Sequence, residues 1–310
     1  MSATLKAHRA QEVRQTSPTR TLVERLGYPA NTKLLIVHAD DLGMAHSVNE
    51  ATIKALETGL VNSGSIMIPC PWVQEIAEYA RRNPGADLGL HLTLTSEWRY
   101  FRWGPVVSKD RVASLLDSDG YLRLTEAEAA KHANVKEVEA EIRAQIDRAR
   151  KLGIQPTHLD SHMGTLYQTQ ELFETLLRVA RENNLPVRIS KEWFSSDASR
   201  APYLPSILKE DDVVIDRVLD INPQVPAEKW ADFYAEALRK LQPGVTEMVI
   251  HLAYDDAEMR AATFDHPDWG AAWRQRDFDF FTSDTFRKLL SDNQIRLITW
   301  REISKLHRKP

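Results

Sequence analysis

The sequence predicts an α/β protein whose seven or eight parallel strands form a TIM-like (β/α) barrel. Short runs rich in β-branched residues alternate with helical patterns along most of the chain, as in parallel βαβ units. Longer irregular stretches at 95–125, 191–211 and 254–281 each follow a predicted strand. In a barrel they would build the face at the carboxyl ends of the strands, where barrel enzymes keep their active sites. An open parallel sheet is the alternative that the strand count leaves open.

The strands are predicted from short apolar runs, at 34–39, 63–68, 87–94, 156–162, 186–190, 212–216, 246–252 and 295–299. Helices are predicted from apolar periodicity between them, at 47–58, 72–83, 136–152, 168–184, 227–241 and 282–293. Start signals such as Ser47 and stop signals such as Gly153 support the helix ends. Residues 1–30 are predicted to form an N-terminal arm with a short helix near 20–26, and residues 31–310 a single catalytic domain.

The composition excludes several classes of function. The 310 residues are 43% hydrophobic and 27% charged, as is ordinary for a globular protein with a core. A formal net charge of -4 argues against a nucleic-acid-binding protein. No apolar run approaches the roughly 18–20 residues that span a bilayer, so no membrane association is expected. The single cysteine, Cys70, excludes an internal disulfide framework, the polar N-terminus lacks a secretory signal, and we expect a cytoplasmic protein. A homodimer is the common default.

Four predicted strands end in residues that bind metals or move protons. The segments are 34–41, 87–93, 157–162 and 248–252. The carboxyl ends of parallel barrel strands meet at one face, so we expect these side chains to lie together. A carboxylate pair and several histidines placed in this way predict a metal site. A metal-assisted hydrolase is therefore the first hypothesis.

The segment 157–162 is the most informative of the four. Side chains two residues apart in a strand share a face, so His158, Asp160 and His162 point the same way. Three ionisable groups on a buried face are costly unless a metal or mutual pairing satisfies them. Imidazole suits zinc and other divalent transition metals, and a nearby carboxylate commonly orients such a histidine. An amphipathic edge strand is the alternative.

The other strand ends supply an acid, a base and further ligands. His91 would face the barrel interior, opposite a row of leucines, although a structural core histidine is equally compatible with the pattern. In the Asp40–Asp41 pair, one carboxylate can ligate a metal while the other accepts a proton from water. A turn or helix-capping pair is the alternative. His251 is a candidate general acid, because the unperturbed histidine pKa of about 6.5 suits proton delivery, or else a structural histidine.

The long loops carry candidate substrate-binding residues. Arg274 would suit an anionic group of a substrate. Aromatic residues in these loops, Trp98 among them, would suit stacking against sugar rings. Packing within the loops or a dimer contact is the alternative for most of them.

Three motifs resemble the ChbG/HpnK (YdjC-like) family of carbohydrate deacetylases. They lie at 39–43, 89–95 and 157–162, and the resemblance extends over residues 33–302. It implies a TIM-like barrel, one divalent metal ion (Mg or Zn), and hydrolysis of the N-acetyl group of an amino sugar or chitooligosaccharide-like chain. Position by position, it implies the following roles: Asp41, His91 and His162 as metal ligands, Asp40 as general base and His251 as acid. In the mechanism that we expect from these roles, His158 and Asp160 orient ligands or substrate.

The chain departs from the family pattern at three places. The family often has Asn where this chain has His38, further histidines where it has Met163 and Gly164, and Pro where it has Leu252. Two other functions stay open on the residues alone. One is a metal-dependent hydrolase of another amide or of a phosphoester on the same barrel. The other is a non-catalytic sugar-binding protein.

Overall fold

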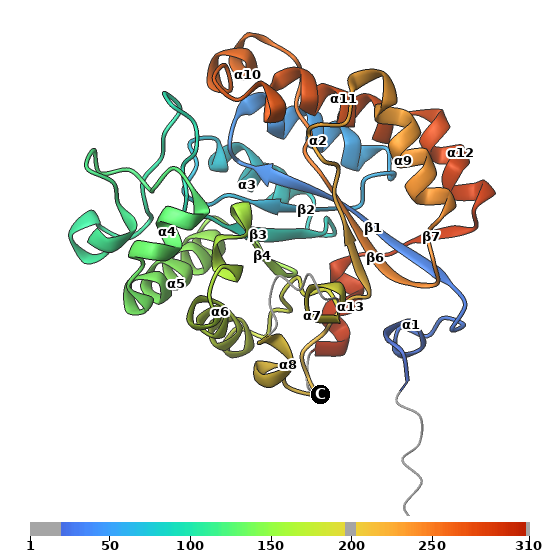
Figure 1. Cartoon of the computed structure of the whole chain (residues 1–310), viewed down its shortest axis with the longest axis horizontal. Helices are drawn as coiled ribbons and strands as arrows, with labels where there is room; N and C mark the ends of the chain where they lie inside the picture. The colour runs from blue at the N-terminus through green and yellow to red at the C-terminus, as the bar shows by residue number, and fades with distance from the viewer. Residues whose placement is uncertain (1–19, 196–202, 308–310) are drawn as a thin grey trace, which may run out of the picture.

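The computed structural model describes residues 20–195 and 203–307, and within them one parallel sheet lies between layers of helices (Figure 1). The sheet order is β4-β3-β2-β1-β6-β5, and β7 pairs with the beginning of β1. All of the paired strands run parallel. The strands are β1 (Lys33–Leu42), β2 (Ser63–Ile66), β3 (Leu88–Leu92), β4 (Leu159–Ser161), β5 (Arg217–Leu219), β6 (Gly244–Ile250) and β7 (Ile295–Leu297).

The predicted parallel α/β fold is confirmed, whereas a closed barrel of seven or eight strands is not. The sheet is curled, and its edge strands β4 and β5 do not pair with each other. Among the residues that the structure describes, only isolated bridges span the gap, between Leu159 and Val187 and between Ser190 and Ile215. The predicted strand 186–190 therefore forms no ladder, and its first residue is a proline, which has no N–H to donate. The predicted strand 212–216 was placed too early, because the ladder begins at Arg217.

The six predicted helices are present as α2, α3, α5, α6, α9 and α12, and a short helix occupies the expected place in the arm. The sequence patterns missed the longer helix α11, because Arg274 and Asp277 lie on its buried side and interrupt the apolar stripe. The helices are α1 (Leu22–Arg25), α2 (His46–Glu57), α3 (Val73–Arg82), α4 (Glu126–His132), α5 (Val135–Lys151), α6 (Gln170–Glu182), α7 (Glu192–Ser195), α8 (Leu204–Ile207), α9 (Trp230–Arg239), α10 (Ala257–Ala262), α11 (Ala271–Phe281), α12 (Asp284–Asp292) and α13 (Trp300–His307).

Apolar strand residues pack outward against the helices and leave the inner face of the sheet to polar groups. Leu88, Leu90 and Leu92 of β3 join a buried cluster with residues of α3, α5 and α6. The alternate positions, Gly89 and His91, therefore face inward, as the pattern predicted. Among the described residues, no helix is both long and apolar enough to cross a bilayer.

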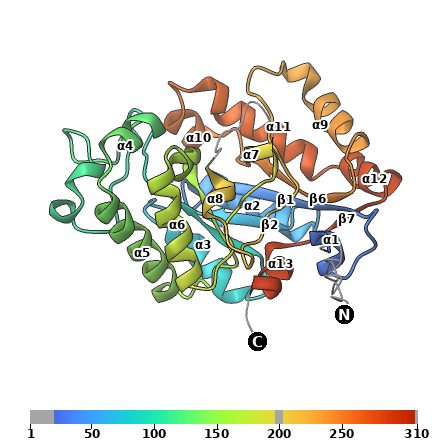
Figure 2. The same cartoon turned by 60° about the horizontal axis from the view of Figure 1, so that its bottom comes forward.

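The short helix α1 closes the amino-terminal end of the sheet. Leu22 and Val23 are buried with Leu34 and Trp300, and Tyr28 donates a hydrogen bond to Glu302 of α13. Figure 2 shows α1 and α13 side by side at this end. Packed apolar side chains thus cover the amino-terminal end of the sheet, and the long loops lie at the carboxyl ends of the strands.

Candidate active site

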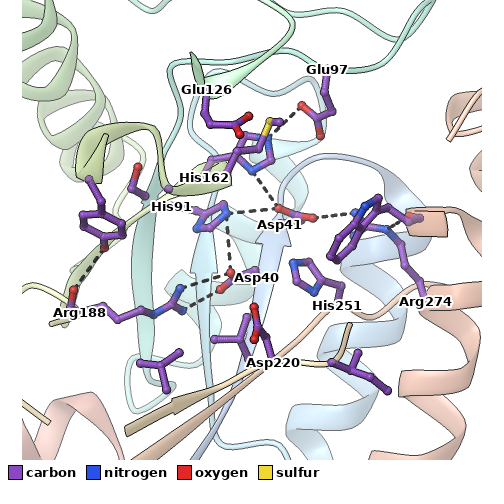
Figure 3. A pocket seen from close by; sticks show the side chains of 18 of the residues that line it. Asp40, Asp41, His91, Glu97, Glu126, His162, Arg188, Asp220, His251 and Arg274 are labelled. Carbon is purple, nitrogen blue, oxygen red and sulfur yellow. Dashed lines mark hydrogen bonds and ion pairs between the residues drawn. The ribbon is translucent and has the colours of Figure 1, made fainter. Parts of the chain in front are cut away.

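A pocket of about 530 Å³ opens at the carboxyl ends of β1, β3, β4 and β6 (Figure 3). Seven of the nine residues that the sequence suggested line it, namely Asp40, Asp41, His91, Trp98, His162, His251 and Arg274. The other two, His158 and Asp160, are buried behind it. Strand ends far apart in the sequence therefore meet around one cavity.

An irregularity in β1 allows neighbouring aspartates to serve the same pocket. Successive strand residues normally face opposite sides of a sheet. The pairing of β1 with β2 shifts register between Ala39 and Leu42, and Asp41 has a left-handed backbone with φ of 69°. Bulges of this kind re-aim side chains beside active sites, and a non-glycine residue rarely adopts this conformation. Both Asp40 and Asp41 consequently line the cavity.

Asp41, His91 and His162 form a buried group that could hold a metal ion. Asp41 Oδ1 lies 3.4 Å from His91 Nε2 and 3.4 Å from His162 Nδ1. Ligands of a tetrahedral zinc ion at 2.0–2.2 Å are about 3.4 Å apart, so the spacing fits such an ion. Asp41 Oδ1 also has no hydrogen-bond partner, although it is buried. An unsatisfied buried carboxylate oxygen between two imidazoles is what a metal-ligand set requires.

A carboxylate holds the far nitrogen of each of the two histidines. His91 Nδ1 lies 2.6 Å from Asp160 Oδ1, and His162 Nε2 lies 3.0 Å from Glu97 Oε2. Such contacts fix the ring orientation and leave the other nitrogen for a metal. Burial lowers the pKa of His162, but the carboxylates of Glu97 and Asp41 outweigh it and raise the pKa to about 9. The metal-free site therefore holds protons, which a metal ion must displace.

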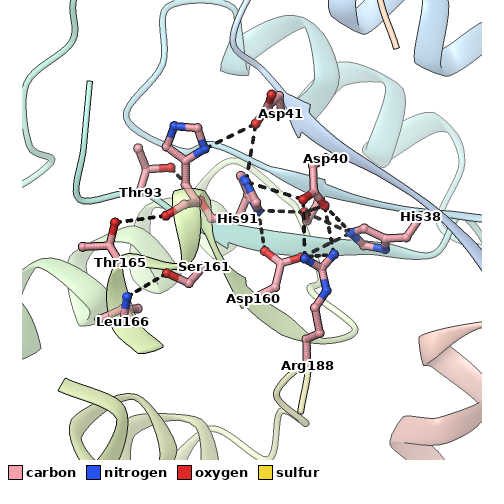
Figure 4. Close-up of polar contacts among 12 residues, drawn as sticks. His38, Asp40, Asp41, His91, Thr93, Asp160, Ser161, Thr165, Leu166 and Arg188 are labelled. Atoms are coloured by element: carbon pink, nitrogen blue, oxygen red, sulfur yellow. Dashed lines mark hydrogen bonds and ion pairs between the residues drawn. The ribbon is translucent and has the colours of Figure 1, made fainter. Parts of the chain in front are cut away.

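Asp40 lies at the edge of a buried network of charges (Figure 4). Arg188 Nη2 donates to Asp40 Oδ1 at 2.9 Å, and His38 Nε2 lies 3.1 Å from the same oxygen. Burial raises the pKa of Asp40, but Arg188, His91 and His38 together outweigh burial and hold that pKa below its usual range. Asp40 is therefore ionised near neutral pH, as a proton acceptor must be.

Arg188 and His38 also tie this network to two further carboxylates. Arg188 contacts Asp160 at 2.9 Å and Glu247 at 3.0 Å. His38 Nδ1 lies 3.3 Å from Glu247. Burial lowers the pKa of His38, but the carboxylates of Glu247, Asp160 and Asp40 together outweigh burial and raise that pKa to about 9. Two cations thus stand among three buried carboxylates, and this pairing makes the burial of the charges tolerable.

His158 belongs to the packed layer beneath the pocket. Its ring stacks on Trp300 with centroids 5.1 Å apart, and its edge meets His38. A side chain at position 89 would collide with this ring, so only a glycine fits there. Burial, and next the charge of His38, hold the pKa of His158 well below its usual value. The structure places no contact between His158 and the three candidate ligands.

His251 stands on the opposite side of the cavity from His91. Its backbone N–H donates to Asp277 at 3.0 Å, and its ring lies 5.1 Å from that of Trp273. Burial lowers the pKa of His251 to about 4. The imidazole is therefore neutral at pH 7, and it needs to gain a proton before it can act as an acid.

Arg274 and Trp98 form part of the cavity wall. Arg274 Nη2 donates to Asp41 Oδ2 at 2.8 Å, so its charge is already balanced by a candidate ligand. This pairing leaves Asp41 Oδ1 free for the two histidines. Trp98 is buried, donates to the sulfur of Met44, and contacts the ring of His266.

Among the site residues that the sequence patterns did not reveal, three hold the predicted ones in place through ion pairs: Arg188, Glu247 and Glu97. Arg188 and Glu247 are charged residues inside apolar runs that were predicted to be buried strands, and that contrast is the signal that could have revealed them. Glu97 lies in the loop after His91, where nothing in the local pattern distinguishes it from a solvated acid.

This fold and site define a class: a parallel α/β protein with a buried two-histidine, one-aspartate centre at its strand ends. The family model described as YdjC-like protein matches residues 34–292, and the chain belongs to that family.

Several proteins, one of them a solved structure, are similar to this chain. A carbohydrate deacetylase of Thermus thermophilus is 35% identical over 285 residues, covering 91% of this chain and 97% of that protein. A chitooligosaccharide deacetylase of Yersinia enterocolitica is 33% identical over 162 residues, covering 51% of this chain and 60% of that protein. The crystal structure of a putative cellobiose-phosphate cleavage protein from Enterococcus faecalis superposes with a TM-score of 0.73 at 26% identity, covering 88% of this chain and 99% of that one.

Proposed function

We propose that this chain is a metal-dependent deacetylase that hydrolyses the N-acetyl group of an amino sugar or of an N-acetylated oligosaccharide. The observation that carries the proposal is the buried Asp41 Oδ1, which makes no hydrogen bond and lies 3.4 Å from one nitrogen of each of two histidines. The names of the relatives, carbohydrate deacetylase and chitooligosaccharide deacetylase, support the choice of substrate class.

Asp41, His91 and His162 would hold the ion, zinc or magnesium. When bound, a divalent ion polarises a carbonyl oxygen and lowers the pKa of water from 15.7 toward about 7. The chain's own contribution is to hold the three ligand atoms in position. Asp160 and Glu97 fix the two imidazoles, and Arg274 fixes the far oxygen of Asp41.

Asp40 serves as the general base. Its Oδ2 lies 3.8 Å from His91 Nε2, directly beside the ligand group, and the pocket reaches it. It takes the proton of the water molecule that adds to the acetyl carbon. Because Arg188 lowers the pKa of Asp40, the carboxyl holds that proton weakly and gives it up readily.

The second proton transfer is to the departing nitrogen. An amide nitrogen leaves poorly without a proton, and breaking the C–N bond releases acetate and a free amine. His251 is the acid in this proposal. Since its imidazole is neutral at pH 7, it passes on a proton that it receives during the reaction, and Asp40 is the source.

Acetate release from N-acetylglucosamine and its oligomers tests the proposal. We expect one acetate and one free amine for each bond cleaved, in protein supplied with zinc or magnesium. Release of phosphate from a panel of sugar phosphates, with no acetate from any N-acetylated sugar, would replace the proposal by another hydrolase activity.

A further inference from the structure

The large apolar side chains that are exposed lie on the same face of the molecule as the pocket. Within the described residues there are seven, all in connections between the end of a strand and the next long helix, with Met163 and Trp269 in short 3-10 helices: Trp72, Tyr100, Tyr121, Leu124, Met163, Phe264 and Trp269. Exposed apolar groups that gather around a cavity mark a binding surface more often than scattered ones do.

Two of these residues form a flat pair outside the pocket. The rings of Tyr100 and Phe264 are stacked, with centroids 5.4 Å apart and planes 10° from parallel. Tyr100 is 74% exposed and Phe264 is 52% exposed. The pair joins the loop after β3 to the loop after α10, so it sits on chain segments that come from both sides of the cavity.

The pair continues the wall of the pocket outward. Trp98 and His266 contact each other with ring centroids 5.3 Å apart, and both line the cavity. Tyr100 and Phe264 each lie two residues along the chain from this inner pair. Two residues of chain span at most about 7 Å, so the outer pair is immediately beyond the mouth.

The charges that line the pocket favour a neutral, hydroxyl-rich occupant, and at the outer pair the guanidinium of Arg99 lies 5.2 Å from the centre of the Tyr100 ring. The lining includes the carboxylates of Glu97, Glu126 and Asp220, whereas both lining arginines, Arg188 and Arg274, are paired with aspartates. Carboxylates accept hydrogen bonds from sugar hydroxyls and repel anionic headgroups or acidic substrates. Aromatic rings offer the apolar face of a sugar ring a flat surface with a polar edge.

We propose that Tyr100 and Phe264 form an outer subsite for a sugar ring beyond the one that carries the reacting acetyl group. The substrate is then an oligosaccharide of three or more rings, with its end in the pocket and its next rings on the outer pair. This inference rests on the proposed deacetylase function, and it further specifies the chain length of the substrate.

Kinetics against chain length test the subsite. The variants are Tyr100→Ala and Phe264→Ala, and the matched control is Tyr121→Ala, an exposed aromatic of the same loop outside the pair. The substrates are N-acetylglucosamine and its dimer, trimer, tetramer and hexamer. We expect KM for the trimer and longer chains to rise by about 3- to 10-fold in the two pair variants, with kcat unchanged. KM for the single sugar should not move, and the control should match wild type.

Three results would overturn the subsite. The first is an equal rise of KM for the single sugar and the hexamer, and the second is no change at any length. The third is a shift in sedimentation of the pair variants with unchanged KM, which would make the pair a contact between copies of the chain. Wild-type protein that releases no acetate at any length would instead refute the deacetylase function itself.

Discussion

Replacing Arg188 by methionine should destabilise the protein and shift its activity toward higher pH. Arg188 is buried and contacts three carboxylates, Asp40 at 2.9 Å, Asp160 at 2.9 Å and Glu247 at 3.0 Å. Methionine fills a similar space without charge, so the three carboxylates would lose their guanidinium partner and keep only the imidazoles of His38 and His91. Removing one partner of a buried ion pair typically costs about 3–5 kcal/mol.

The cost can be expressed as a melting temperature. An unfolding entropy of about 2.1 cal/mol/K per residue gives about 0.65 kcal/mol/K for the 310 residues. A loss of 3–5 kcal/mol then lowers Tm by about 5–8 °C, which thermal unfolding followed by circular dichroism would measure. Arg188→Lys is the matched control. It keeps the charge, but one ammonium cannot replace the guanidinium fork, so we expect a smaller fall.

The sign of the pH effect follows from the pKa of Asp40. Burial raises that pKa, but Arg188 together with His91 and His38 lowers it below its usual value, so these contacts stabilise the fold above the unfolded pKa of about 3.9. The stability gap between wild type and Arg188→Met should therefore be largest near neutral pH and shrink as the pH falls below about 4. The acid limb of kcat should move to higher pH in the variant, because Asp40 is then harder to ionise. A Tm within about 1 °C of wild type at pH 7 would refute this account of the network.

Three further predictions address the site residues. Asp40→Asn should retain bound metal and lose about 10²- to 10⁴-fold in kcat, measured by elemental analysis and acetate release; loss of the metal would mean that Asp40 and Asp41 have exchanged roles. Glu97→Gln should weaken zinc binding by about 10- to 100-fold in a chelator competition, because His162 loses its orienting carboxylate; unchanged affinity would make this contact incidental. The folded pKa of His251 is about 4 against about 6.5 unfolded, so its contribution to stability falls as the pH drops through that window. The Tm of His251→Gln should accordingly fall less than the Tm of wild type when the pH is lowered from 7 to 5. An equal fall in both proteins would count against the lowered pKa of His251.

The sequence predicted the strand ends that form the pocket because their signals are local. Asp40, Asp41, His91, His162 and His251 each close a recognisable apolar run, and parallel strands bring such ends together. The same rule could not show that Asp40 and Asp41 both face inward. Strict alternation would separate them, and the bulge in β1 and the left-handed backbone of Asp41 depend on pairing with β2.

Other features depended on contacts that no local pattern reveals. Arg188 lies in the irregular segment between β4 and β5, and only the folded structure shows that its side chain reaches Asp40. Residues 186–190 were predicted to form a strand that would help to close the barrel. They form isolated bridges and no ladder, so the sheet is curled and not closed. Arg274 was predicted to meet an anionic substrate, but its guanidinium is engaged by Asp41, which lies 233 residues away in the sequence.

The central claim is that Asp41, His91 and His162 hold one divalent ion on which deacetylation depends. The most direct test strips the protein with a chelator, adds zinc or magnesium in measured steps, and follows acetate release from N-acetylated chitooligosaccharides together with bound metal. We predict that activity is absent in the stripped protein and returns in full at one ion per chain, and that His162→Ala neither binds the ion nor recovers. Full acetate release from metal-free protein, or an ion that binds equally well without His162, would contradict the account.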